Sequence, residues 1–353
     1  MFASVINPLF NPTQSMTHRW LLSLPLLPGL LLWLLSNTSA ANNYTQHPQF
    51  SDFLDEVVSE GIYPKEQLIT LMQSTTRNES ILKAIARPAE KTLTWAEYRK
   101  IFLTEDRINQ GVEFYRQHKD TFAKASKTTG VPEEMILAIL GVETRYGKHR
   151  GSYRVVDALA TLGFDYPPRA KFFRKQLKEF LFLEQEAGID LSTAKGSYAG
   201  AMGYPQFIPS SYRHYAVDFD GDKKIDLIDN PADAIGSIAN YLKVHGWRPN
   251  EPITTPARYL KNGTSDKSNA ALTAALNQSL KPKHTVKELS DLGLIPDLTV
   301  PASEKATAMR LQGDNGDEYW LGLRNFYVIT RYNHSRLYAM AAYQLSQALK
   351  EKI

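Results

Sequence analysis

The stretch AILGVETRYGKHRG, residues 138–151, has the pattern of a buried helix end that carries a carboxylate. Ile136, Ile139 and Leu140 precede Glu143 by seven, four and three residues, so all four side chains share one helix face. A carboxylate on an apolar face is costly when ionised, so its pKa rises and it stays protonated near neutral pH. A general acid needs this property, which makes Glu143 the candidate catalytic residue.

Two neighbouring features bear on this interpretation. Gly147 follows Glu143 by four residues, where it allows the helix to stop and a cleft to open. The alternative interpretation is a glutamate at the edge of the core that pairs with Arg145 or Arg150.

The composition is that of a globular protein. The chain has 353 residues, enough for two or three domains, and 43% hydrophobic against 22% charged residues permits a sizeable core. The net charge is +4, but no run of Lys or Arg stands out, so no nucleic-acid partner is expected. A mildly basic protein of this kind suits a polymer that carries carboxylates. The absence of cysteine excludes a thiol nucleophile, a thiolate zinc site and a cysteine-linked lipid anchor.

The N-terminal region has the three parts of a secretory signal peptide. A polar lead from Met16 holds Arg19, an apolar run covers 20–35, and small residues follow in NTSAA. The run is short for a membrane span and contains Pro25 and Pro28, so we favour export with cleavage over an uncleaved anchor. The sequence predicts an exported, periplasmic protein that is soluble or anchored by an uncleaved signal.

The rest of the chain is mainly α, with a minor antiparallel sheet (α+β). One helix is predicted from Thr104 to Gly130, and Thr94 and Glu97 form a capping pattern for the helix before it. Residues 249–325 are polar, proline-bearing and less periodic, and Asn315-Gly316 between two strand-like runs indicates a hairpin.

A second informative stretch, KGSYAGAMGYPQFIPSSYRHYAVD, covers residues 195–218. Its glycines, alanines and prolines predict a tight, irregular loop whose backbone a bulky ligand can approach. The loop offers hydroxyls, an amide and aromatic faces, an inventory that suits sugars: Ser197, Tyr198, Gln206, Tyr212 and Tyr215. The alternative is a packed turn with its tyrosines in the core.

The stretch DFDGDKKIDLID, residues 218–229, has the spacing of an EF-hand calcium loop. The expected ligands are the side chains of Asp218, Asp220, Asp222, Asp226 and Asp229 and the backbone carbonyl of Lys224. Lys223 stands where glycine usually makes the turn, and Asp229 is shorter than the usual glutamate. A solvated acidic turn is the alternative, but five carboxylates repel one another without a cation, so we favour a structural Ca²⁺. The histidines show no metal-pair spacing, so no metal is expected in catalysis.

Three ordered blocks together resemble the lytic murein transglycosylase B family, glycoside hydrolase family 103: ETRYGKHRGSYRVVDALATL, GSYAGAMGYPQFIPSSYRHYAVDFDGD and DAIGSIANYLKVHGW. The resemblance implies a goose-lysozyme-like core with a flanking helical domain and a small β domain. The implied organisation is a signal region at 1–41, a helical domain at 42–130 completed by 334–353, a core with the EF-hand-like loop at 131–248, and a β-containing domain at 249–333.

The resemblance also implies roles for individual residues. Glu143 is implied as the single catalytic acid/base, and Arg169 matches a cleft arginine, with Pro168 where members carry a second arginine. The other implied substrate-binding residues are Ser197, Tyr198, Gln206, Tyr241, Tyr332, Asn333 and Tyr338.

The implied activity is that of a lytic transglycosylase, a lyase that cleaves the MurNAc–GlcNAc β-1,4 bond of peptidoglycan and leaves 1,6-anhydroMurNAc ends. Its partners are then peptidoglycan glycan strands and possible cell-wall synthesis machinery. One alternative is a hydrolytic lysozyme of the same fold, which needs a second carboxylate such as Asp157 or Asp165 or a positioned water. Another is a non-catalytic peptidoglycan-binding scaffold, against which the apolar setting of Glu143 argues.

Overall fold

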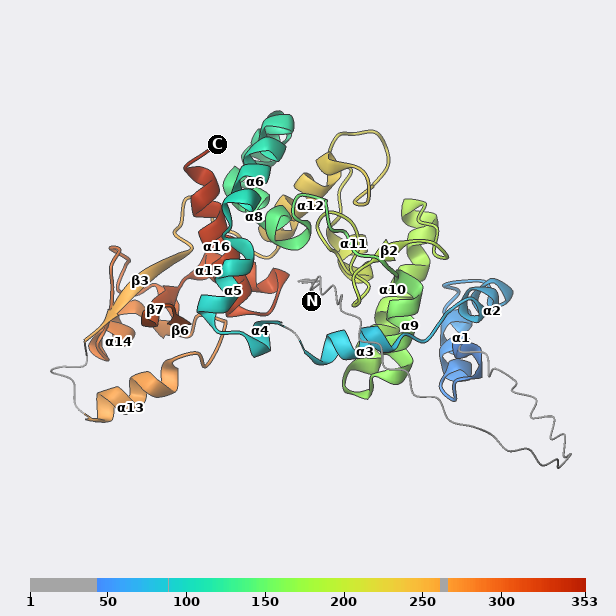
Figure 1. The fold of residues 1–353 in the computed structure, drawn as a ribbon, viewed down its shortest axis with the longest axis horizontal. Coiled ribbons are helices and arrows are strands. Elements are labelled where there is room, and N and C mark those ends of the chain that lie inside the picture. The colour runs from blue at the N-terminus through green and yellow to red at the C-terminus, as the bar shows by residue number, and fades with distance from the viewer. Residues whose placement is uncertain (1–42, 88, 261–265) are drawn as a thin grey trace, which may run out of the picture.

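The computed structural model describes residues 43–87, 89–260 and 266–353. Helices dominate, and a small antiparallel sheet lies at one end of the molecule (Figure 1), which confirms the predicted fold class. The predicted signal peptide and the start at Met16 lie outside the described residues. Within these ranges, no helix is both long enough and apolar enough to cross a membrane.

One end of the molecule is built around two long helices, α9 and α10, that pack side by side (Figure 1). The first helices of the chain lie against them, and the ring of Phe53 meets the ring of Phe164 edge-on. The elements here are η1 (Tyr44–Gln46), α1 (Phe50–Ser59), α2 (Lys65–Gln73), α3 (Glu79–Ala86), α9 (Val155–Asp165), η2 (Pro167–Arg169) and α10 (Ala170–Ala187).

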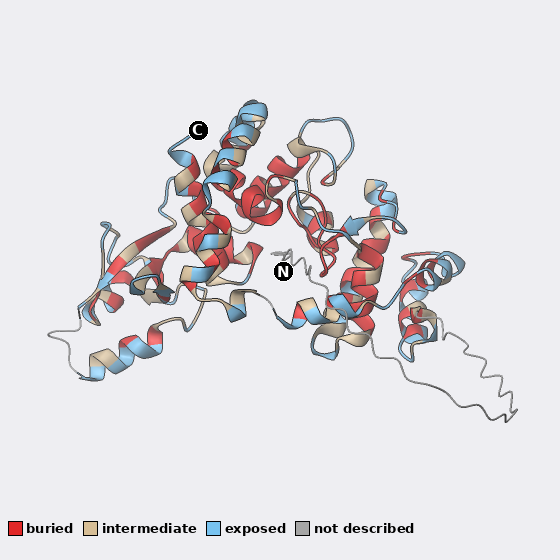
Figure 2. Ribbon diagram, viewed as in Figure 1, coloured by how far each residue is buried: buried red, intermediate tan, exposed pale blue. Residues whose placement is uncertain are grey.

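The centre of the molecule is organised around α8, which packs on α16, α12, α6 and α7. Every residue of α8 from Met135 to Thr144 is buried, so this helix is enclosed on all sides rather than along one stripe (Figure 2). The central helices are α4 (Ala89–Thr92), α5 (Trp95–Phe102), α6 (Glu105–Gln117), α7 (Lys119–Thr129), α8 (Glu133–Thr144), α12 (Pro231–Val244), α15 (Arg324–Tyr332) and α16 (Arg336–Lys350). The helices between residues 50 and 129 thus contribute to both groups, and the predicted domain boundaries stay a prediction.

An irregular segment joins the two groups of helices. The two-residue strands β1 (Tyr153–Arg154) and β2 (Lys195–Gly196) pair antiparallel, and the short helix α11 (Pro209–Tyr215) packs on α10 and α12. The predicted sugar-binding loop therefore lies between the two groups of helices.

The insert after α12 has its own sheet and its own small core. Its five strands are ordered β4-β6-β7-β3-β5, all antiparallel. The elements are β3 (Thr254–Tyr259), α13 (Asp266–Ala275), β4 (His284–Thr285), α14 (Val286–Asp291), β5 (Leu294–Pro296), β6 (Lys305–Gly313) and β7 (Gly316–Gly322). Gly313 pairs with Gly316, so the predicted hairpin turns at Asp314-Asn315, one residue earlier than the Asn-Gly signal indicated.

Local sequence signals explain most helix ends, with one exception. The capping box of Thr94 and Glu97 is present, and Gly130 ends α7 in a left-handed conformation. The single helix predicted from Thr104 to Gly130 is wrong, because the chain breaks at His118, whose backbone leaves the helical region. The break lets α7 turn away from α6 and pack on α12, a tertiary contact that the helical pattern does not encode.

Candidate active site

Glu143 lies in the last turn of α8 with only 6% of its surface exposed. The helix ends just after it because Arg145 adopts a left-handed backbone conformation with φ of 51°. Gly147 therefore does not stop the helix, which corrects the sequence interpretation. Gly147 has a left-handed φ of 85°, and it packs directly against the ring of Tyr204. A Cβ at this position would overlap that ring.

The carboxyl group of Glu143 has an asymmetric environment. The hydroxyl of Tyr338, in α16, donates a hydrogen bond of 2.6 Å to Oε1. The other oxygen, Oε2, is buried and has no hydrogen-bond partner among the described residues. Burial raises the pKa of Glu143 well above its ordinary value; the bond from Tyr338 opposes this, and the charge of Glu90 adds to it. The raised pKa favours the protonated acid, and one oxygen is left for a ligand.

Neither arginine of the alternative interpretation pairs with Glu143. Arg145 turns away to Gln110 and Asp106, and Arg150 bonds Asp229 and a backbone carbonyl. The interpretation of Glu143 as one half of a structural ion pair therefore fails.

Three predicted tyrosines gather beside Glu143. The rings of Tyr332 and Tyr338 are parallel with centroids 6.4 Å apart, and Tyr241 meets Tyr332 edge-on at 4.8 Å. The hydroxyl of Tyr332 donates to the carbonyl of Pro205 over 2.6 Å, and that of Tyr241 donates to the carbonyl of Arg331 over 2.6 Å. The tyrosines therefore tie the 195–218 loop and the end of α15 into one aromatic wall.

The polar residues of the 195–218 loop hold its shape. The Ser197 hydroxyl is fully buried and accepts hydrogen bonds from the backbone N–H groups of Ala199 and Ala201. Gln206 has a left-handed φ of 50°, and its side-chain amide donates to the carbonyls of Gly203 and Arg150. Tyr198, 8% exposed, lies near enough to Glu90 for that charge to help burial raise its pKa to about 12.

One tyrosine of the loop follows the packed-turn alternative. Tyr212 is 3% exposed, donates to the carbonyl of Ile225 and accepts from the N–H of Leu227. It is a core residue that connects the loop to the acidic segment after it, so it carries no ligand role here.

Sequence reasoning missed Glu90 and its partner Tyr98 in this site. Glu90, in the four-residue helix α4, accepts hydrogen bonds from the Tyr98 hydroxyl at 3.3 Å and from the Asn333 amide at 3.5 Å. Nothing in the local sequence indicates this, because α4 is distant in the chain from α8 and from Asn333. The carboxylates named from the sequence are engaged elsewhere: Asp157 bonds Arg154, and Asp165 accepts from Tyr44.

Arg169 ends η2, directly before α10. Its guanidinium lies 4.2 Å from the ring centre of Phe172 and 5.2 Å from that of Phe173. Burial lowers the pKa of His334, and the charges of Arg331 and Arg169 act in the same direction, so Arg169 lies within electrostatic range of the residue after Asn333.

The acidic loop brings together three of its six predicted ligands. Carboxylate oxygens of Asp218, Asp220 and Asp222 lie within 4.8 Å of one another, all on exposed side chains. Hard oxygen donors at this spacing fit Ca²⁺. Lys223 adopts a left-handed φ of 72°, so it makes the turn that glycine usually makes.

The other predicted ligands have different contacts in the structure. Asp226 accepts from the backbone N–H groups of residues 228 and 229, and Asp229 forms an ion pair with Arg150 at 2.9 Å. Asp233, which the sequence did not single out, is buried and accepts from the N–H groups of Phe219 and Asp226, so it clamps the two sides of the loop. The backbone carbonyl of Lys224 stays a predicted ligand.

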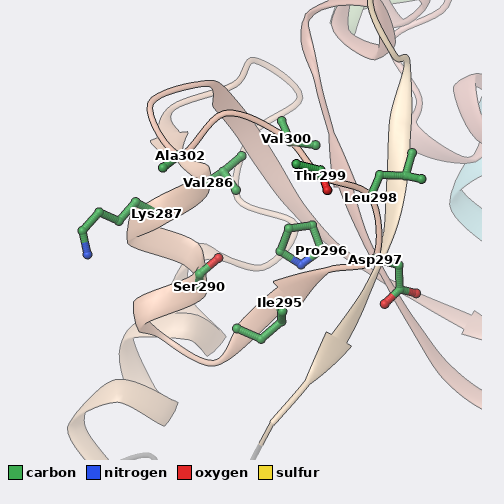
Figure 3. Close-up of a pocket in the computed structure, with 10 residues that line it drawn as sticks. All are labelled: Val286, Lys287, Ser290, Ile295, Pro296, Asp297, Leu298, Thr299, Val300 and Ala302. Carbon is green, nitrogen blue, oxygen red and sulfur yellow. The ribbon is translucent and has the colours of Figure 1, made fainter.

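A separate hollow of about 420 Å³ opens in the insert between α14, β5 and the segment after β5 (Figure 3). Its lining is mostly apolar, and its charged members have partners: Lys287 pairs with Asp291, and Asp297 pairs with Arg258. It offers no group for chemistry, so Glu143 and its neighbours are the candidate site.

Comparison with known proteins identifies relatives over most of the chain. The family model described as Transglycosylase SLT domain matches residues 45–347. Membrane-bound lytic murein transglycosylase B of Escherichia coli (strain K12) is 40% identical over 316 residues, which cover 87% of this chain and 84% of the relative.

Solved structures agree with the fold. The catenated lytic transglycosylase SltB1 from Pseudomonas aeruginosa is 48% identical with a TM-score of 0.81 and covers 88% of this chain and 99% of its own. The Escherichia coli lytic transglycosylase Slt35 in complex with calcium is 39% identical with a TM-score of 0.77, covering 89% and 97%. SltB3 from Pseudomonas aeruginosa in complex with NAG-anhNAM-pentapeptide is 29% identical with a TM-score of 0.70, covering 86% and 79%.

Proposed function

Because the chain belongs to the transglycosylase SLT domain family and is a lytic transglycosylase of peptidoglycan, we propose that Glu143 is the single acid/base of its reaction. The observation that carries this proposal is the buried carboxyl whose Oε1 is held by Tyr338 and whose Oε2 has no partner among the described residues, in a setting that raises its pKa. A proton on Oε2 is available to a substrate and to no described protein group.

The reaction cleaves the bond between N-acetylmuramic acid and N-acetylglucosamine in two steps. First, Glu143 gives its proton to the glycosidic oxygen as the C1–O bond breaks, and the sugar's own acetamido oxygen bonds to C1. Then the ionised Glu143 takes the proton of the C6 hydroxyl, whose oxygen displaces the acetamido oxygen and closes the 1,6-anhydro ring. Glu143 regains its acid form and no water is consumed, so the site must exclude water.

The residues around Glu143 fit this two-step transglycosylase reaction better than they fit hydrolysis. A hydrolase needs a second carboxylate that acts on water or on the sugar. Glu90 is near enough to influence the pKa of Glu143, but its Oε1 already accepts hydrogen bonds from Tyr98 and Asn333. Assistance by the substrate's acetamido group needs no second acid. Tyr338 keeps Oε1 in place through both protonation states, and the buried rings of Tyr241 and Tyr332 keep the surroundings of the carboxyl apolar.

Product analysis tests the reaction class. Mass spectrometry of purified peptidoglycan digested in ¹⁸O-water is expected to show 1,6-anhydromuramic ends without isotope. Mainly reducing muramic ends that carry ¹⁸O would identify a hydrolytic lysozyme, and the absence of any product would identify a binding scaffold.

The acidic loop is proposed to hold a structural Ca²⁺ ligated by Asp218, Asp220 and Asp222. The relative Slt35 was solved in complex with calcium, which supports this choice of ion. The carbonyl of Lys224 and the side chains of Asp226 and Asp229 would complete the shell, and Asp229 must then share or leave Arg150. The ion relieves the repulsion of the three exposed carboxylates and joins the sugar-binding loop to α12.

Calcium binding is expected to raise the melting temperature. An ion that binds only the folded state stabilises it by mass action, about 1.4 kcal/mol at ten times the Kd, or roughly 2 °C for a chain of this length. Scanning calorimetry with calcium, magnesium or chelator measures this, with magnesium less effective. Asp220→Ala should abolish the response, while Asp55→Ala, an exposed aspartate in α1, should keep it. A parent curve indifferent to calcium would leave the loop as an acidic turn.

The cellular setting stays a proposal. The N-terminal sequence favours an exported, periplasmic enzyme that is soluble or held by an uncleaved signal, and the lack of cysteine excludes a cysteine-linked lipid. Peptidoglycan glycan strands are its substrate, and cell-wall synthesis machinery is a proposed partner.

A further inference from the structure

A hollow of about 1000 Å³ is lined by residues from the end of α1 and the first turns of α10, and Glu143 is not among them. Figure 1 labels these two helices. Its lining contains five cationic side chains, Arg169, Lys171, Arg174, Lys175 and Lys178, against three carboxylates, a surplus of two positive charges. Phe172, Phe182 and prolines add apolar surface. We call this feature the basic hollow. Its chemistry suits a ligand with carboxylates on a partly aliphatic chain.

The carboxylates of the basic hollow are already neutralised by partners. Glu56 and Glu60, on α1, both accept from the ammonium of Lys178 at 2.7 Å, and Glu179 bonds Arg213. Arg174 donates to Gln49 and to a backbone carbonyl.

Two lysines of the basic hollow have no such partner. Lys171 and Lys175 are exposed, one helical turn apart, and form no ion pair or hydrogen bond with another described residue. They lie in the first two turns of the 18-residue helix α10, whose N-terminal end adds positive potential. The free positive charge of the hollow is therefore concentrated at its α10 wall.

Arg169 is the one candidate substrate-binding residue among the lining residues of the basic hollow. This residue lines the hollow, and its charge also acts on His334, the residue directly after Asn333. Asn333 in turn bonds Glu90 beside Glu143. Arg169 therefore lines the basic hollow and is also within electrostatic range of the segment that carries Asn333 and His334.

We propose that the basic hollow binds the stem peptide of the substrate, with Lys171 and Lys175 contacting its carboxylates. The inference rests on the proposed function, since the glycan must first lie at Glu143. A stem peptide leaves the muramic acid through its lactyl group and carries free carboxylates on its D-glutamate and at its end. Extended, five residues span roughly 17 Å, so a stem peptide can reach well beyond the muramic acid that carries it. The relative SltB3 was solved with a substrate that carries a pentapeptide.

Kinetics on two forms of the same polymer test the inference. The variant Lys171→Gln/Lys175→Gln is compared with the parent on peptide-bearing glycan strands and on strands stripped of peptides by an amidase. We expect KM to rise about three- to tenfold on peptide-bearing strands with kcat unchanged, because two exposed ion pairs are lost. Kinetics on stripped strands should stay at the parental level. High salt should reduce the parent's preference for peptide-bearing strands.

A matched control separates the hollow from net charge. Lys119→Gln/Lys127→Gln removes two exposed lysines without ion pairs from α7, and it should change neither substrate's kinetics. Equal losses on both substrates, or no change on peptide-bearing strands, would overturn the inference. A parent that cleaves neither form would instead refute the proposed function, so the two failures are distinguishable.

Discussion

Replacing Glu143 with glutamine is expected to lower the rate of peptidoglycan cleavage by about three orders of magnitude or more while the protein stays folded. The amide has nearly the same shape and can still accept the hydrogen bond from Tyr338, but it has no proton to give to the glycosidic oxygen and cannot take one from the C6 hydroxyl. General acid–base catalysis alone supplies roughly 10²–10⁴-fold, and here one residue serves both steps. Turnover by product release from purified sacculi, with sedimentation binding in parallel, measures the effect.

The stability of the same variant is its internal control. A buried ionisable group is replaced by a neutral one, so the melting temperature of Glu143→Gln should equal or exceed that of the parent. Binding to sacculi should persist. Near-parental turnover would contradict the assignment, and a loss of binding together with turnover would mean that Glu143 shapes the site rather than performs the chemistry.

The pH profile gives a second readout of Glu143. The first step needs its protonated form, so kcat/KM should fall as pH rises through its raised pKa. Glu90 is a negative charge that helps to raise this pKa. Glu90→Gln removes that charge, so the pKa of Glu143 should drop and the alkaline limb should move to lower pH. An unmoved limb would mean that Glu90 does not act on Glu143.

The second large effect is expected at Gly203, in the 195–218 loop. Its φ of 70° is left-handed, and a Cβ there would overlap the backbone carbonyl of Leu227. Backbone atoms cannot rotate out of the way as a side chain can, so the loop must shift. Gly203→Ala is expected to lower the free energy of unfolding by about 3 kcal/mol or more, from the conformational cost and the overlap together. Cleavage should fall as well, because Gln206 bonds the carbonyl of Gly203.

Gly188→Ala separates the two causes. Gly188 has a similar φ of 65° at the end of α10, but a Cβ there meets nothing within 4 Å. Gly188→Ala should lower the free energy of unfolding only by the cost of a left-handed alanine backbone, about 1–2 kcal/mol. It should leave cleavage unchanged. Urea unfolding of both variants measures the difference. Equal losses would mean that the contact with Leu227 contributes nothing.

Much of the fold could be predicted because its signals are local. Caps such as Thr94 with Glu97, the glycine at residue 130, and the polar, hairpin-bearing insert each act within a few residues of the chain. The predictions that failed involve tertiary contacts. The helix breaks at His118 within a continuous helical pattern, and α7 packs on α12. Gly147 makes room for the ring of Tyr204 and does not end α8. A helical period does not encode which surface a helix will meet.

The sequence by itself determined the fold class, the burial of Glu143 and the candidate residues around it, because apolar periodicity and ordered motif blocks are properties of the chain alone. Only the tertiary structure decided what surrounds that carboxyl: Tyr338 on Oε1, Glu90 and Tyr98 from distant helices, and Asp229 paired with Arg150 instead of facing the other aspartates. The reason is physical. The pKa and reactivity of a carboxyl depend on desolvation and on charges within a few ångströms, and these come from segments that the chain order keeps apart.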